Sequence, residues 1–105
     1  LLARTGGEEF ALMASGIDRA SVAGLADACR AALADAPVHY ETEDGGVGET
    51  PLTASVGLAS LEPQTAEVFN RVERLLNAAD QAVRAAKGAG GDCLRLFTPR
   101  SRAAA

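Results

Sequence analysis

The chain has few or none of several residue types that define classes of protein. Its 105 residues include no tryptophan, one tyrosine, three phenylalanines and two cysteines. Cys29 and Cys93 are too few for a disulfide framework or a four-ligand zinc site, so a reducing, cytoplasmic setting is the simplest expectation. No apolar run approaches the ~20 residues that a helix needs to cross a bilayer.

Basic residues are also scarce. The 10 lysines and arginines are outnumbered by 14 acidic residues, which gives a net charge of −4. This balance argues against a non-specific nucleic-acid binder, which needs a basic surface. Alanine is abundant instead, with 23 copies, so few large side chains remain to build a core. The 48% of apolar residues still excludes a wholly disordered chain, and the length allows one small domain.

The first fifteen residues predict a β-hairpin. Two short apolar runs, residues 1–3 and 10–14, flank Gly6 and Gly7. A pair of glycines between apolar runs is a turn signal because glycine tolerates a positive φ. The same two residues let a ligand approach the backbone closely, because no Cβ stands in the way.

Two amphipathic helices are predicted beyond the hairpin. The first has Asp18 as its N-cap and runs to about Asp35, and the second lies between Thr65 and Gly88. Apolar residues at steps of three and four form their stripes, which are Val22, Leu25, Ala26, Cys29, Ala32 and Leu33 in the first helix and Val68, Val72, Leu75, Leu76, Ala79 and Val83 in the second. Cys29 is therefore expected in the core.

Strands are predicted at 38–42 with a return after the loop at 44–46, at 52–59, and at 93–97. The element order is then hairpin, helix, strand pair, helix, strand. Strands mixed with long helices predict an α+β, sandwich-like fold in which two helices cover an antiparallel-rich sheet.

Glu8 and Glu9 follow the glycine pair directly. Adjacent carboxylates supply the hard oxygen ligands that suit Mg²⁺. A backbone open to phosphates beside a carboxylate that binds Mg²⁺ is what phosphoryl-transfer chemistry requires. On these residues alone, a solvated turn with two surface acids remains the commoner outcome.

Three segments, in order, resemble the GGDEF family, the diguanylate cyclases. Residues 4–10, Arg4-x-Gly6-Gly7-Glu8-Glu9-Phe10, resemble the signature hairpin in its GGEEF form. Residues 52–59, LTASVGLA, resemble the family's VTVSIGVA strand, and residues 80–92, DQAVRAAKGAGGD, resemble its D-x-A-L-Y-x-A-K-x-x-G-R-N helix end. Residues 1–97 are thereby identified as the C-terminal part of a GGDEF domain, with a tail over 98–105.

The resemblance implies a function and a set of site residues. The family joins two GTP into cyclic di-GMP and releases two pyrophosphates, in bacterial second-messenger signalling. The fold resembles the palm-like core of the adenylyl cyclases, and two such domains face each other as a homodimer. Glu8 matches the position that binds Mg²⁺, or Mn²⁺, and activates the 3′-hydroxyl, and Glu9 matches the fourth motif letter. Gly6 and Gly7 match the backbone that closes on GTP, and Lys87 matches a phosphate contact.

The chain also departs from the family pattern. Gly91 stands where an arginine that contacts phosphate is usual, and Asp92 stands where asparagine is usual. The added carboxylate would oppose a triphosphate if it faced the site. An alternative function is therefore a degenerate GGDEF domain that binds GTP or cyclic di-GMP, or only dimerises, without catalysis. A third is an unrelated α+β interaction domain.

The family's first half has no counterpart in these residues, and the chain starts at Leu1. That half carries the central strand, a second metal-binding aspartate and the residues that read guanine. We expect the 105 residues alone to be inactive, and unstable or self-associating, because the sheet edges and an apolar face stay open. The intact protein could be attached to a membrane through an upstream sensor.

Overall fold

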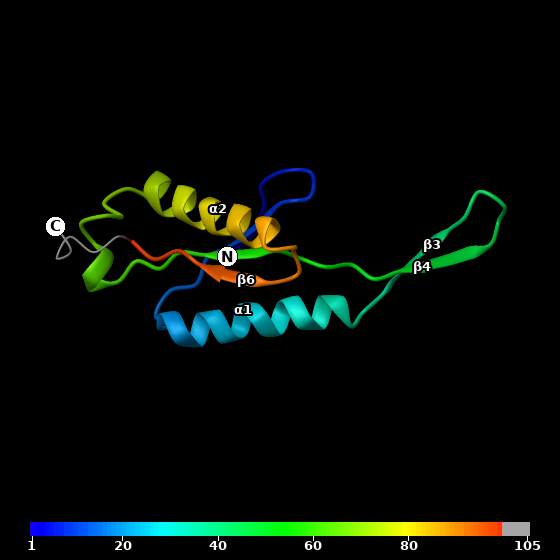
Figure 1. The fold of residues 1–105 in the computed structure, drawn as a ribbon, viewed down its shortest axis with the longest axis horizontal. Helices are drawn as coiled ribbons and strands as arrows, with labels where there is room; N and C mark the ends of the chain where they lie inside the picture. The colour runs from blue at the N-terminus through cyan, green and yellow to red at the C-terminus, as the bar shows by residue number, and fades with distance from the viewer. Residues whose placement is uncertain (100–105) are drawn as a thin grey trace.

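A computed structural model describes residues 1–99 and confirms the α+β class (Figure 1). Within this range, six short strands form three separate pairs, β1–β2, β3–β4 and β5–β6, and two of the pairs are antiparallel. In chain order the elements are β1 (Leu2–Arg4), β2 (Phe10–Leu12), α1 (Arg19–Ala34), β3 (Val38–Glu41), β4 (Val47–Thr50), β5 (Val56–Leu58), the 3₁₀ turn η1 (Pro63–Thr65), α2 (Val72–Gly88) and β6 (Leu94–Leu96).

The predicted boundaries of the first helix are confirmed, and those of the second are too wide. Asp18 is the N-cap of α1 and accepts a 2.8 Å hydrogen bond from the Ser21 N–H, and Asp35 is the C-cap. α2 begins only at Val72, because η1 and an irregular segment occupy residues 63–71. Residues 100–105, most of the predicted tail, lie outside the described residues, and the domain boundary at 97 remains a prediction.

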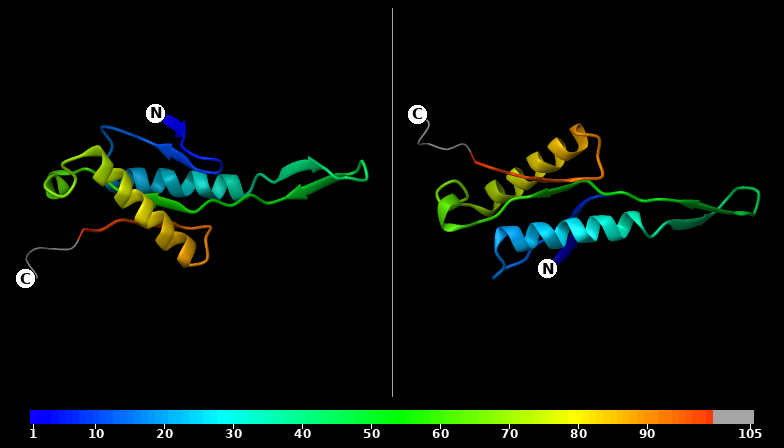
Figure 2. Two further views of the ribbon diagram at one scale, coloured as in Figure 1. Left: turned by 90° about the horizontal axis from the view of Figure 1, so that it is seen from above. Right: turned by 60° about the horizontal axis from the view of Figure 1, so that its bottom comes forward.

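The parallel pair β5–β6 lies between the two helices, with α2 on one side and α1 on the other (Figures 1 and 2). The predicted strand over 52–59 is shorter than expected, because only Val56–Leu58 forms β5. Its ladder is limited by its partner, since the pairing starts where the Val56 N–H donates to the Cys93 carbonyl and continues along β6. None of the helices in the described part is long and apolar enough to cross a membrane.

The core is the seam between α2 and β5. Ala78, Ala82 and Ala86 are buried at successive steps of four residues on α2. A Cβ added to Gly57 of β5 would lie only 2.3 Å from the Ala79 carbonyl oxygen and 2.4 Å from the Val83 nitrogen. The helix backbone therefore touches the strand, and the Val83 Cγ2 lies 2.8 Å from the same Cβ position, so Gly57 has no room for a side chain.

The predicted apolar stripe of α2 is consequently wrong in part. The side chains of Val72 and Leu76 are 60% and 50% exposed, whereas the alanines that the prediction omitted form the buried face. The packed face of the helix is rotated away from its largest side chains because Gly57 provides space for small residues only.

Helix α1 has no buried residue. Val22 and Ala26 of its predicted stripe are half-buried, but Leu25 is 51% exposed and Cys29 is exposed as well. The expectation that Cys29 lies in the core is therefore wrong. The covered face of α1 instead includes Asp27 and Arg30, because α1 packs against β5 and β6 on that side.

The two antiparallel hairpins contact no other helix or strand in residues 1–99. The β3–β4 hairpin extends away from the two helices as an arm, which accounts for much of the 61 Å length of the molecule (Figures 1 and 2). Within the arm, the Tyr40 ring lies across Gly48, where an added Cβ would be 2.4 Å from the ring. No strand within the described range joins the three pairs into one sheet.

Candidate functional site: the glycine-glutamate hairpin

The signature residues form the tip of the β1–β2 hairpin, as predicted. The strands pair in the register Leu2↔Leu12, Ala3↔Ala11 and Arg4↔Phe10. Beyond the last pair, the N–H groups of Thr5 and Gly6 both donate to the Glu9 carbonyl, at 2.9 and 3.3 Å. These bonds close a short loop, so Gly6, Gly7 and Glu8 project from the end of the hairpin.

The expected reason for the two glycines is wrong, and only Gly7 is open on its Cβ side. Neither Gly6 nor Gly7 has a positive φ, which occurs at four other glycines of the chain. A Cβ added to Gly7 would meet nothing within 4 Å, and one added to Gly6 would lie 3.2 Å from Glu9 Oε2. Gly7 thus leaves its part of the tip backbone uncovered, whereas the Glu9 side chain lies beside Gly6, and neither glycine permits a left-handed turn.

Arg4, the last residue of β1, forms hydrogen bonds to the backbone of the hairpin tip, a role that the sequence did not suggest. Its Nε donates to the carbonyls of Gly6 and Gly7, at 3.2 Å each, and its Nη2 also donates to the Gly7 carbonyl. A charged donor is stronger than a neutral one, so Arg4 fixes the direction of both carbonyls. The signal that could have found it is its place in the motif, two residues before the glycine pair.

The carboxylates of Glu8 and Glu9 are both exposed at this tip. Neither belongs to an ion pair among residues 1–99, so both are free to bind a cation or a ligand. Their oxygens suit Mg²⁺, which takes one or two carboxylates together with phosphates and water. The described residues hold no cluster of three potential ligands, so Glu8 and Glu9 are a partial donor set for that ion.

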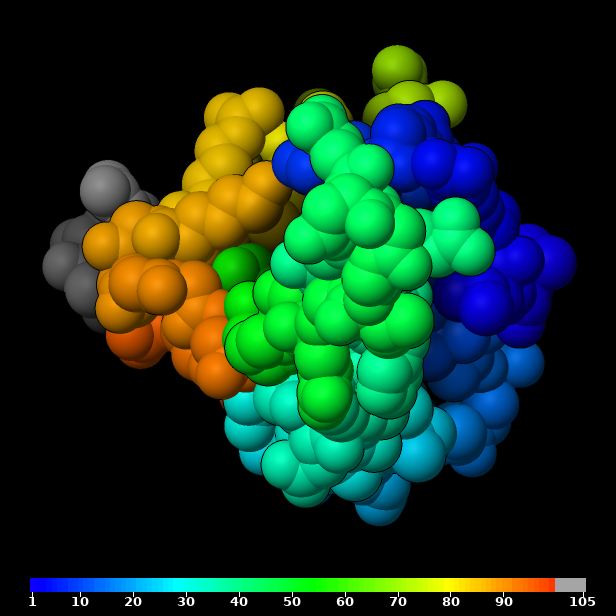
Figure 3. Space-filling model, turned by 90° about the vertical axis from the view of Figure 1, so that its right-hand side faces the viewer, coloured from blue at the N-terminus to red at the C-terminus, as the bar shows by residue number. Residues whose placement is uncertain are grey.

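Lys87 lies in the last turn of α2 and is exposed. Its ammonium forms no ion pair within the described range, so it is available to an anion. Neither of the hairpin strands, β1 and β2, contacts α2, and no ion pair among residues 1–99 joins Lys87 to the hairpin. In Figure 3 most of the hairpin lies across the β3–β4 arm from the C-terminal end of α2, and a part of it comes out beside that end.

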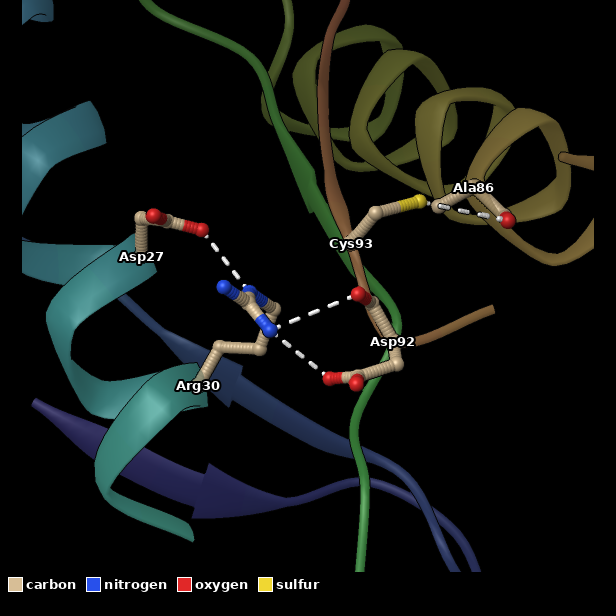
Figure 4. Close-up of polar contacts among 5 residues, drawn as sticks. All are labelled: Asp27, Arg30, Ala86, Asp92 and Cys93. Atoms are coloured by element: carbon tan, nitrogen blue, oxygen red, sulfur yellow. Dashed lines mark hydrogen bonds and ion pairs between the residues drawn. The ribbon is translucent and has the colours of Figure 1, made fainter. Parts of the chain in front are cut away.

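Asp92, the departure from the family pattern, has φ 48° and is the single non-glycine residue with a positive φ among residues 1–99. Asparagine and aspartate are the residues that tolerate this region best, so Asp92 serves the backbone as asparagine would. Its carboxylate is 2.7 Å from Arg30 Nη1 (Figure 4). The negative charge that would oppose a triphosphate is therefore paired within the protein.

Arg30 was also missed by the sequence analysis. Its Nε lies 2.8 Å from Asp27 Oδ1, one turn earlier on α1, while its Nη1 reaches Asp92. The hydrogen bonds to Asp27 and then to Asp92 raise the pKa of Arg30 further above its ordinary value. Nothing in the sequence pairs positions 30 and 92, because the contact joins segments 62 residues apart.

Comparison with known proteins supports the family that the hairpin motif indicates. The family model described as "Diguanylate cyclase, GGDEF domain" matches residues 1–93. No curated protein and no solved structure matches the chain. The family match covers the hairpin, both helices and the β3–β4 arm, so it excludes the alternative of an unrelated interaction domain. The chain belongs to the GGDEF family of diguanylate cyclase domains.

Proposed function

We propose that this domain, in its intact protein, condenses two GTP into cyclic di-GMP. In each half-reaction the 3′-hydroxyl oxygen of one GTP bonds to the α-phosphorus of the other. The bond from that phosphorus to the bridging oxygen breaks, pyrophosphate leaves, and the hydroxyl proton passes to a base. The observation that carries the proposal is the hairpin tip, where two unpaired carboxylates stand beside an uncovered backbone.

The roles of the site residues follow from their chemistry. Glu8 would hold the divalent cation, Mg²⁺ or Mn²⁺, which lowers the pKa of a bound hydroxyl and stabilises charge on phosphate. Glu9 would act beside it on the cation or the nucleotide. The open backbone at Gly7, with Gly6 beside it, would admit the nucleotide, and Lys87 would bind its phosphates as a point charge.

The reaction also implies a partner. A product with two identical halves requires two GTP in opposed orientation, so a second GGDEF domain would face this one in a homodimer. Each hairpin would then present one GTP to the other. The substrate places the domain in the cytoplasm, whether or not the intact protein is attached to a membrane.

The test is turnover by the full-length protein. GTP and Mg²⁺ are supplied, and cyclic di-GMP and pyrophosphate are measured by mass spectrometry and a coupled assay. Glu8→Gln keeps the size of the side chain and removes its charge, and we expect a loss of about 10²-fold or more in kcat. Glu43→Gln removes an equal charge from the loop of the β3–β4 arm and should leave turnover unchanged. Equal activity in all three proteins would overturn the assignment of Glu8.

The alternative is a domain that binds nucleotide without catalysis. Gly91, which replaces a usual phosphate contact, is the observation that favours it. Isothermal titration with GTP and with cyclic di-GMP separates the two functions. Binding of either ligand without any product, in a full-length protein that has Mg²⁺ and is dimeric, would assign the domain to the regulatory class.

A further inference from the structure

Two segments that lie 62 residues apart in sequence meet at the guanidinium of Arg30 (Figure 4). Arg30 belongs to α1, Asp92 ends the loop that follows α2, and Cys93 immediately precedes β6. Besides the Asp92 carboxylate at 2.7 Å, Arg30 Nη1 reaches the Asp92 backbone carbonyl at 3.3 Å. One side chain of α1 therefore holds both the side chain and the main chain of the loop.

The loop that Arg30 holds has an unusual backbone. Gly90, Gly91 and Asp92 have consecutive positive φ values of 112°, 75° and 48°. The Gly91 N–H donates back to the Ala86 carbonyl at 2.9 Å, and the Cys93 thiol donates to the same carbonyl at 3.5 Å. A positive φ costs little at the two glycines and more at Asp92, which has a Cβ, so the contacts of Asp92 support the one residue of the run that needs them.

Arg30 differs from an ordinary surface arginine. Its side chain is 19% exposed and bonds to three acceptor atoms on two residues. The Arg84–Asp80 pair on α2 provides a contrast, because it joins neighbouring turns of one helix and its arginine is 77% exposed. Exposed pairs of that kind contribute little, whereas Asp27 pre-orients Arg30 toward a single partner on another element.

We propose that Arg30 and Asp92 are positioning residues, which clamp the end of α2 to α1 and thereby fix Lys87 for its phosphate. This step rests on the proposed function, because it takes Lys87 as a phosphate contact. Lys87 lies one residue after Ala86, whose carbonyl anchors the loop, and five residues before Asp92. With the clamp open, the last turn of α2 loses the Gly91 and Cys93 bonds that end on it, and the backbone of Lys87 is no longer held in place.

The first arm of the test measures the clamp without any nucleotide. Amide hydrogen exchange over residues 86–93 and at Val56 is followed in the full-length protein by mass spectrometry. We expect Arg30→Ala to speed exchange there by about three- to tenfold, because the loop opens locally. Arg84→Ala removes the same charge from an exposed pair and should change nothing. Asp92→Asn keeps an acceptor and tolerates the positive φ, so it should retain most of the protection.

The second arm measures the dissociation constant for GTP in Arg30→Ala, Lys87→Ala and the double variant. If Arg30 acts through Lys87, its substitution weakens binding by about fivefold alone and adds little once Lys87 is gone. Fully additive effects, or unchanged exchange in Arg30→Ala, would overturn the proposal. A protein that binds no GTP in any form refutes the proposed function and the role of Lys87, and the exchange arm then decides on the clamp by itself.

Discussion

The two helices have similar lengths, 16 and 17 residues, and both are rich in alanine, yet they are held in different ways. α2 has three alanines buried at steps of four residues, and its backbone at Ala79 and Val83 meets Gly57 of β5. α1 has no buried residue and lies on the other side of the same two strands. The side of α1 that carries Leu25 and Cys29 is exposed.

Polar side chains replace close packing at α1. Arg30 reaches Asp92, and Arg19 donates from Nη2 to the Phe97 carbonyl at 3.0 Å. A long side chain can bridge two elements whose backbones stay apart, whereas a row of alanines requires backbone contact. Substitutions that add volume should therefore damage α2 and spare α1, and the predictions below test that difference.

The largest effect is expected at Gly57. In Gly57→Ala the new Cβ would lie 2.3 Å from a backbone oxygen of α2, so the helix itself must move. Overpacking of this kind costs about 3 kcal/mol of the free energy of unfolding, measured by urea denaturation of the full-length protein. A loss under about 0.5 kcal/mol would show that α2 is not in contact with β5.

A slightly smaller effect is expected on the helix side of the same seam. Ala82 is 4% exposed, so Ala82→Leu forces the helix away from the strand at a cost of about 1 to 3 kcal/mol. Ala28→Leu on α1 is the matched control, because Ala28 is exposed and the change should stay within about 0.5 kcal/mol. Equal losses in the two variants would contradict the contrast between the helices.

The same contrast explains how much of the fold the sequence could predict. The N-cap Asp18, both helices and the hairpin around Gly6 are local features, set by capping, periodicity and turn chemistry. The rotation of each helix is not local. In α2 the buried face follows from Gly57, a glycine on another element, and in α1 it follows from polar contacts with the segment after α2.

In the candidate site, too, the sequence could predict local features but not contacts between distant segments. Glu8 and Glu9 could be placed at a hairpin tip because the motif is contiguous and its turn is short. Arg4 was overlooked because an arginine in a strand gives no signal of bonds to the carbonyls of its own turn. The neutralisation of Asp92 by Arg30 could not be foreseen, since it depends on the approach of two helices across a strand pair.

Substitution of a glycine in α1 by alanine is expected to stabilise the protein, unlike the same substitution at Gly57. A Cβ added to Gly24 would meet nothing within 4 Å outside its own helix. Gly24→Ala should therefore stabilise the protein by up to about 1 kcal/mol, because alanine loses less backbone entropy in a helix. Thermal denaturation beside Gly57→Ala shows whether one substitution type raises the Tm at α1 and lowers it at β5. A lower Tm in Gly24→Ala would mean that α1 has a packed neighbour on that side.

The smallest expected effect is a pH dependence of α1, whose N-terminus has a titratable cap that the N-terminus of α2 lacks. Hydrogen bonds from Ser21 lower the pKa of Asp18 below its ordinary value of 3.8, whereas the N-cap of α2, Arg71, makes no side-chain capping bond. Because the folded pKa is the lower one, the stabilisation of α1 is complete above pH 3.8 and is lost as pH falls through the folded pKa. The amide shift of Ser21 should titrate below pH 3.8 by NMR, and Asp18→Asn, which caps equally well, should abolish that titration. A midpoint at or above 3.8 would mean that the Asp18 cap does not hold the first turn of α1 in solution.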